Sequence, residues 1–83
     1  MSEQQTDITA GPGGVMTQEV GVVTGDLTLR SELSDQGDVT LRVQYKDAGE
    51  WYTVQGAKAH IADKGDLAAV HAIAVALLNR PSG

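Results

Sequence analysis

Cysteine is absent from this chain of 83 residues. The fold therefore has no disulfides, and neither thiolate nucleophiles nor thiolate metal ligands are available to it. A chain without cysteine fits a reducing compartment. A domain of this size lies near the lower limit at which one hydrophobic core suffices without cross-links. We therefore expect one small domain that has to bury nearly all of its bulky apolar side chains.

Hydrophobic runs long enough to cross a membrane are also missing. The longest apolar stretch, Leu67 to Leu78, contains one polar residue, His71, and falls well short of the roughly 20 residues that span a bilayer. The sequence starts with MSEQQ, which is polar and acidic, whereas a signal peptide starts with basic residues. These features predict a cytoplasmic protein with no membrane contact.

Basic residues are scarce, with six Lys and Arg against eleven Asp and Glu, so the net charge is −5. General affinity for nucleic acid depends on neutralising phosphates with basic side chains, and an acidic chain repels phosphates at long range. The charge therefore disfavours nucleic acid and fits a partner with a basic surface.

The strongest helical signal lies between Gly65 and Pro81. Asp66 stands where an N-cap residue is expected, and Arg80 and Pro81 provide a cation and a stop at the other end. Helical spacing places the bulky apolar side chains on an arc somewhat wider than half of the helix. We expect the following side chains of this arc to be buried against a sheet: Leu67, Val70, Ile73, Leu77 and Leu78.

Alanines occupy most of the rest of this helix. Because one sheet covers only one side of a helix, the stripe formed by Ala68, Ala72 and Ala76 would let a second helix approach closely. These three residues therefore predict the interface of a homodimer. The alternative is that the alanines face water, where alanine is an excellent helix former.

A repeat of twelve residues precedes the helix. Its units are GDLTLR at 25–30, GDVTLR at 37–42 and GEWYTV at 49–54. This spacing suits one strand and one turn of an antiparallel meander. With the weakly alternating segment 15–23 as the first strand, the sequence predicts an α+β fold, a four-stranded antiparallel β-meander packed by one C-terminal α-helix (ββββα).

Alternation assigns the faces of these strands. The third repeat has two phases to choose from, and we favour the one that buries Tyr52 and Val54 because both side chains are apolar. The other phase would bury Trp51 and Thr53. The side chains expected to face the helix are Leu29, Leu41, Val43 and Val54.

The register between the first two repeats is suggested by one ion pair. Pairing Leu33 with Leu41 would place Glu32 opposite Arg42 on the outward side of the sheet. An exposed pair of this kind contributes at most a few tenths of a kcal/mol, so it favours this register only slightly.

The first 14 residues carry one bulky aliphatic side chain, Ile8, and end in four residues of glycine and proline. Such a segment buries too little apolar surface to offset the entropy lost on ordering. We therefore expect residues 1–14 to form a flexible tail and residues 15–83 to form the single α+β domain. The alternative is a tail that becomes ordered on a partner.

The outward side of the predicted sheet is the most suggestive surface, because large aromatics and arginine often dominate binding. We expect Trp51 to lie beside Arg42 or within one strand of it, where a guanidinium can rest over the indole. This surface favours a small, acidic, non-enzymatic protein-interaction domain of the inhibitor, immunity or adaptor type. The alternatives are an ordinary solvated face and single-stranded nucleic-acid binding through Trp51, Arg30 and Arg42. The predicted binding residues are Trp51, Arg42, Arg30, Thr40 and Thr53.

The two histidines lie among acids in the pattern His60-x2-Asp63-x2-Asp66-x4-His71. This spacing matches no metal motif, and no serine sits in a nucleophile motif. We therefore predict neither a metal nor a cofactor and do not expect an enzyme. His71 is expected to be a core or rim residue bonded to a backbone carbonyl. A small dimeric enzyme with its site near His60 and His71 is the second alternative.

Overall fold

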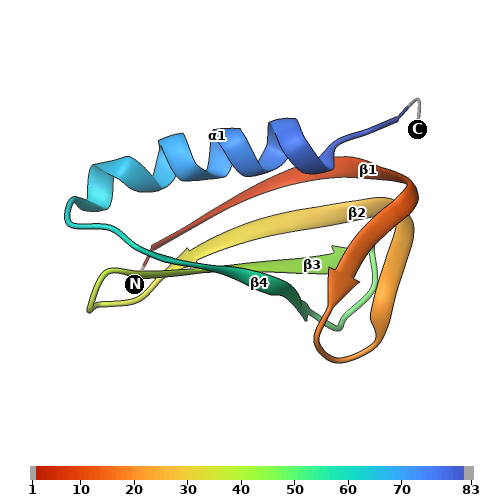
Figure 1. The fold of residues 1–83 in the computed structure, drawn as a ribbon, viewed down its shortest axis with the longest axis horizontal. Helices are drawn as coiled ribbons and strands as arrows, with labels where there is room; N and C mark the ends of the chain where they lie inside the picture. The colour runs from red at the N-terminus through yellow and green to blue at the C-terminus, as the bar shows by residue number, and fades with distance from the viewer. Residues whose placement is uncertain (1, 82–83) are drawn as a thin grey trace.

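The structure, a computed structural model, describes residues 2–81. These residues form four antiparallel strands, a short 3₁₀ helix and one α-helix (Figure 1). The strands follow one another in meander order, and the helix packs on the first two. The predicted α+β fold, a four-stranded antiparallel meander with one C-terminal helix, is confirmed. The elements are β1 Ser2–Thr17, β2 Gly21–Leu33, β3 Asp38–Tyr45, β4 Tyr52–His60, η1 Lys64–Asp66 and α1 Leu67–Leu78.

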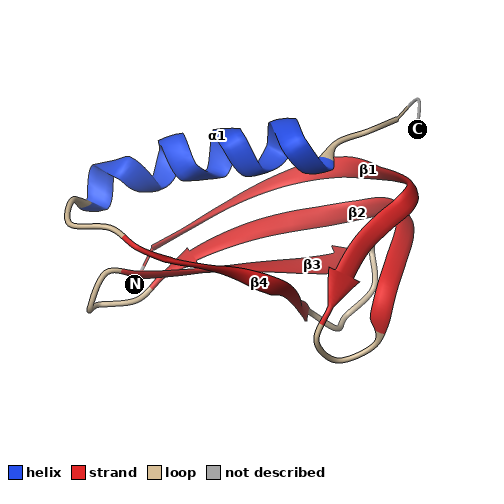
Figure 2. Cartoon of the chain, viewed as in Figure 1, coloured by secondary structure: helices blue, strands red, loops and turns tan. Residues whose placement is uncertain are grey.

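The sheet curves until its first and last strands meet. β1 pairs with β2 on one side and, at Thr17, with Val54 of β4 on the other. Next to this pair, the backbone N–H of Gln18 donates to the carbonyl oxygen of Thr53 at 2.9 Å. Figure 2 shows the end of β1 curling down toward β4. The closure brings the turn between β1 and β2 next to β4.

Residues 2–14, which were predicted to be a flexible tail, are instead part of β1. Their pairing with β2 runs from Ser2 opposite Leu33 to Ala10 opposite Gly25. Ile8 and Ala10 are 4% and 5% exposed and belong to the main core. The segment is ordered because its backbone gains a full ladder along β2, although it contributes few large apolar side chains.

The glycine-rich end of this segment interrupts the ladder without ending the strand. The register with β2 shifts between Ala10 and Val15. Gly14 has a φ of +66°, and a Cβ there would lie 2.4 Å from Cγ1 of Val22 and 2.6 Å from the carbonyl oxygen of Val23. Only glycine fits this close approach of the two strands.

The segment 15–23, predicted to be one strand, contains a chain reversal. β1 ends at Thr17 and β2 begins at Gly21, whose φ is +74°. The hydroxyl of Thr17 donates to the carbonyl oxygen of Gly21 at 2.7 Å and accepts from the N–H of Val20 at 3.2 Å. These local bonds hold the turn, which the weak alternation of the sequence concealed.

The core is formed by alternate side chains of the strands. Leu29, Val43 and Val54 are buried as predicted, and Leu41 packs against the core while only partly buried. Tyr52 is also partly buried against it, so the preferred phase of the third repeat is confirmed. The largest fully buried side chains are Leu27, Leu29, Leu33, Val23, Val39 and Val43.

The predicted register between the first two repeats is wrong by two residues. Leu33 lies opposite Val39 rather than Leu41, and Glu32 lies opposite Thr40. The reason is a shorter loop, in which the N–H of Ser34 donates to the carbonyl oxygen of Asp38 at 2.9 Å. A shift of two residues leaves every side chain on its predicted face, because side chains alternate with a period of two.

The helix is oriented differently from the prediction. Leu67, His71 and Ala74 are buried, whereas Ile73 and Leu77, which were expected to be buried, are 63% and 65% exposed. The sheet covers the side of α1 that carries His71, because this polar residue finds its hydrogen-bond partners there. The three alanines predicted to form a dimer interface, Ala68, Ala72 and Ala76, are exposed.

Asp66 precedes α1 at the N-cap position, as predicted, but its carboxylate does not make the expected capping hydrogen bond. A 3₁₀ turn, η1, precedes α1, and Asp66 itself has helical backbone angles and makes no side-chain cap. Asp63 takes the capping role instead, and its carboxylate accepts from the N–H of Gly65 at 2.9 Å.

Candidate functional site

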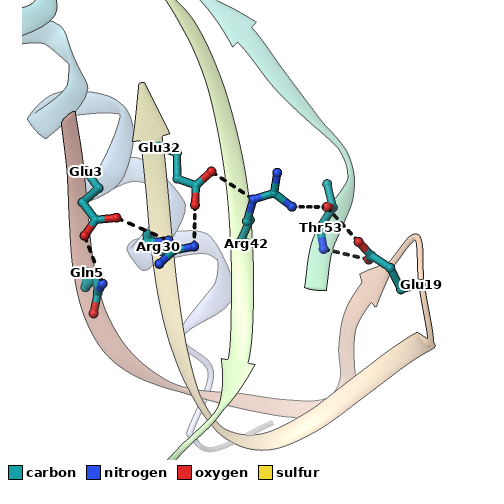
Figure 3. A network of polar contacts seen from close by, with 7 residues as sticks. All are labelled: Glu3, Gln5, Glu19, Arg30, Glu32, Arg42 and Thr53. Carbon is teal, nitrogen blue, oxygen red and sulfur yellow. Dashed lines mark hydrogen bonds and ion pairs between the residues drawn. The ribbon is translucent and has the colours of Figure 1, made fainter. Parts of the chain in front are cut away.

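The outward side of the sheet carries a continuous chain of polar contacts that crosses all four strands (Figure 3). At its centre the Glu32 carboxylate lies between two arginines. It forms an ion pair with Nη2 of Arg30 at 2.5 Å and accepts a hydrogen bond from Nε of Arg42 at 2.9 Å. Because Arg30 and Arg42 are direct cross-strand partners, the two guanidiniums would repel each other without this carboxylate. We call the outward surface around these residues the outer face.

The chain of contacts ends at the closure of the sheet. The Thr53 hydroxyl accepts from Nη1 of Arg42 at 2.6 Å and donates to the Glu19 carboxylate at 2.9 Å. The N–H of Thr53 donates to the same carboxylate at 2.7 Å. Desolvation acts to raise the pKa of Glu19, but the hydrogen bonds from Thr53 and the charge of Arg42 outweigh it, so this pKa lies below 4.5. Glu19 therefore fastens the turn between β1 and β2 onto β4.

Trp51 lies against an arginine, as predicted, but the arginine is Arg30 of β2. The guanidinium carbon of Arg30 is 3.9 Å from the centre of the indole ring. Trp51 is partly exposed, just before β4 begins. The Nε of Arg30 is 3.5 Å from the Glu3 carboxylate and is the one buried side-chain nitrogen or oxygen of residues 2–81 without a hydrogen bond. Arg30 is thus held by charge and stacking more than by directed bonds.

The structure brings the predicted binding residues together on the outer face, with unequal access. Thr40 lies on the same face, opposite Glu32 and Lys58. Thr53 is only 7% exposed, and its hydroxyl is used within the chain. The carboxylates were not among the predicted site residues. The ion pair between Glu32 and Arg42 was predicted from the sequence and is present, although the register is different. The position of Glu32, two residues after Arg30 on the same strand, was the available signal for its second contact.

Removal of the central carboxylate tests the role of this chain of contacts. Glu32→Ala is expected to lower the free energy of unfolding by about 1–3 kcal/mol, because it leaves two partly buried cations facing each other. Urea unfolding measures the change. Glu3→Ala removes a half-exposed carboxylate from the same arginine and should cost less than about 1 kcal/mol. Equal effects of the two variants would show that Glu32 has no special place between the arginines.

The two histidines have separate roles. His71 is buried, with Nδ1 2.7 Å from the Ser31 hydroxyl oxygen and Nε2 2.7 Å from that of Thr6. Its partners are therefore two hydroxyls and not the backbone carbonyl that was predicted. His60 is exposed at the end of β4 and lies 3.1 Å from the Asp38 carboxylate. A Ser–His pair can transfer a proton, but Ser31 is fully buried, so a substrate has no access to it.

Within residues 2–81, no group of three or more His, Asp or Glu side chains is placed to hold a metal ion. In the same residues, no helix has both the length and the apolar character that crossing a membrane requires. Comparisons with models of protein families, with curated proteins and with solved structures gave no match. The function is therefore argued from the surfaces of this chain.

Proposed function

We propose that the chain is a small, non-enzymatic protein-interaction domain of the inhibitor, immunity or adaptor type that works in the cytoplasm. It binds its partner through the outer face, around Trp51 and Arg30. The observation that carries this proposal is the stack of the Arg30 guanidinium on the partly exposed Trp51 ring. Tryptophan and arginine are the residues most enriched among those that dominate binding energies.

The contacts around this stack prepare it for binding. Glu32 and Glu3 hold the Arg30 guanidinium, and the Thr53–Glu19 pair fixes the neighbouring Arg42. Side chains that are already ordered lose less conformational entropy when a partner binds. The carboxylates on the same face, together with the net charge of −5, favour a partner with a basic surface.

Single-stranded nucleic acid is the alternative ligand, because a base can stack on Trp51. The ion pairs that the two arginines already form with a carboxylate disfavour nucleic-acid binding. Both arginines of the outer face are bound to the Glu32 carboxylate, so a phosphate would have to compete with that carboxylate. The affinity that basic residues normally contribute is therefore reduced.

Trp51→Ala should separate binding from folding. Because Trp51 is partly exposed, we expect the free energy of unfolding to fall by only roughly 1–2 kcal/mol. Capture of the partner by the immobilised protein from an extract of its own cells should be lost. Val20→Ala shortens an exposed apolar side chain in the turn between β1 and β2 and should leave capture unchanged. Mass spectrometry of the captured protein and thermal unfolding of both variants provide the measurements.

Two outcomes would contradict the proposal. If Trp51→Ala unfolds the protein, Trp51 is a core residue and not a binding residue. If a labelled single-stranded oligonucleotide binds at low salt, and Arg42→Glu together with added salt removes that binding, the nucleic-acid alternative replaces the protein partner.

A further inference from the structure

The side of α1 that faces away from the sheet is entirely apolar. A surface helix normally places its polar residues outward, but the one polar residue of α1, His71, is buried. Figure 1 shows the sheet on one side of the helix and no other element on its opposite side. The exposed residues of α1, which we call the helix face, are Ala68, Ala69, Ala72, Ile73, Ala76 and Leu77.

A groove extends the helix face toward the sheet. It has a volume of about 250 Å³ and lies between α1 and strands β3 and β4. Leu41 and Ala57 line it on the side of the strands, and Ile73 and Leu77 line it on the side of the helix. Contiguous apolar surface of this kind on a small protein marks an interaction site.

We propose that a second copy of this chain covers the helix face, with the two α1 helices antiparallel about a two-fold axis near Ala72 and Ile73. The distribution of side-chain sizes supports this orientation. Alanine occupies the exposed positions in the first half of α1, and the large side chains Ile73 and Leu77 lie in the second half. An antiparallel pair places Leu77 of each copy against Ala68 and Ala69 of the other. A parallel pair would place large side chains against each other and leave a gap between the alanines.

Charges at the two ends of the helix face are also self-complementary. Asp66 precedes α1 and Arg80 follows it, and within residues 2–81 neither has an ion-pair partner. An antiparallel arrangement brings Arg80 of each copy toward Asp66 of the other. Lys64 lies at the same end as Asp66, but Asp63 offsets its charge. This match of the face to itself, in both shape and charge, is the reason for choosing a second copy as the occupant.

The dimer is expected to dissociate on dilution. The 12 residues of α1 extend about 18 Å, so two such helices bury less than the roughly 800 Å² per partner of a standard interface. The dimer contact does not overlap the outer face, because α1 packs on the opposite side of the sheet. The dimer proposal therefore does not depend on the proposed function.

Sedimentation over a wide concentration range provides the first test. The wild type is expected to change from monomer to dimer as the concentration rises, and Ala72→Arg should remain a folded monomer throughout. Val20→Arg places the same charge at an exposed apolar position outside the helix face and should still dimerise. A wild type that stays monomeric at the highest concentration, or an Ala72→Arg variant that dimerises as the wild type does, would overturn the proposal.

Cysteine cross-linking tests the orientation, because the natural chain has no cysteine. Ala72→Cys lies near the two-fold axis and should form a disulfide-linked dimer by itself under mild oxidation. Ala69→Cys and Ala76→Cys should each cross-link poorly alone but efficiently when mixed. Efficient cross-linking of each variant alone, without gain on mixing, would indicate parallel helices and exclude the antiparallel pair.

Discussion

Deletion of residues 1–10 is expected to leave the protein unfolded. The deletion removes the part of β1 that pairs with β2 from Leu33 to Gly25, together with the buried Ile8. It also removes the carbonyl oxygen of Thr9, which accepts from the N–H of Arg80 at 2.7 Å. A domain of this size has a total stability of only about 5–15 kcal/mol, and the loss of this part of β1 with its backbone hydrogen bonds and its buried side chains exceeds that reserve. Far-UV circular dichroism and the dispersion of amide NMR signals show whether the truncated chain folds.

A point substitution gives a graded version of the same test. Ile8→Ala should lower the free energy of unfolding by about 2–5 kcal/mol, because it leaves a cavity in the core. Gln5→Ala, at an exposed position of the same strand, should change it by less than about 0.5 kcal/mol. If the deletion mutant folds with the melting temperature of the full chain, residues 1–10 form a tail and the first strand of the structure is wrong.

The sequence was sufficient for the fold class but misleading about its first strand. The repeats starting at Gly25, Gly37 and Gly49 correctly predicted the strands that became β2, β3 and β4. The expected number of four strands was reached by counting residues 15–23 as one strand and leaving out residues 2–14. In the structure these two segments are the whole of β1, a turn and the start of β2.

Physical reasons explain why β1 escaped detection. Its inward positions include Thr6 and Ala10, a polar and a small side chain, so the apolar alternation of an ordinary strand is weak. What orders the segment is its pairing with β2, in which Ser2 lies opposite Leu33, and a hydrogen bond between Thr6 and His71 of the last element. Local composition contains neither kind of information.

For the candidate site, the sequence predicted which side chains share a face of the sheet but not the contacts that join distant segments. The period of two placed Arg30, Arg42 and Thr40 on one outward side. The contact of Glu19 with Thr53 depends on the closure of the sheet, which no local pattern indicates. The orientation of α1 was also hidden, because a helix that is apolar on nearly all sides gives no preference for one of them.

His71 determines which side of α1 faces the sheet, and the same residue should make the protein sensitive to mild acid. In the neutral form one ring nitrogen donates and the other accepts, and the Ser31 and Thr6 hydroxyls suit both roles. Burial lowers the pKa of His71 below its ordinary value of 6.5. At a pH between the pKa of His71 in the folded chain and its ordinary value in the unfolded chain, the unfolded chain binds a proton that the folded chain does not. Stability is therefore complete above pH 6.5 and falls as the pH decreases toward the folded pKa, by at most about 1.4 kcal/mol per pH unit.

Urea unfolding from about pH 5 to 8 should show this loss in the wild type and no comparable slope in His71→Leu. The substitution itself should cost about 2–5 kcal/mol at neutral pH, because it leaves the Ser31 and Thr6 hydroxyls without a partner. His60→Gln removes the exposed histidine and should retain the slope. Glu19, whose pKa lies below 4.5, stabilises the fold above that value and loses its effect only at lower pH. If His71→Leu keeps the slope of the wild type, or if His60→Gln abolishes it, the acid sensitivity does not originate at His71.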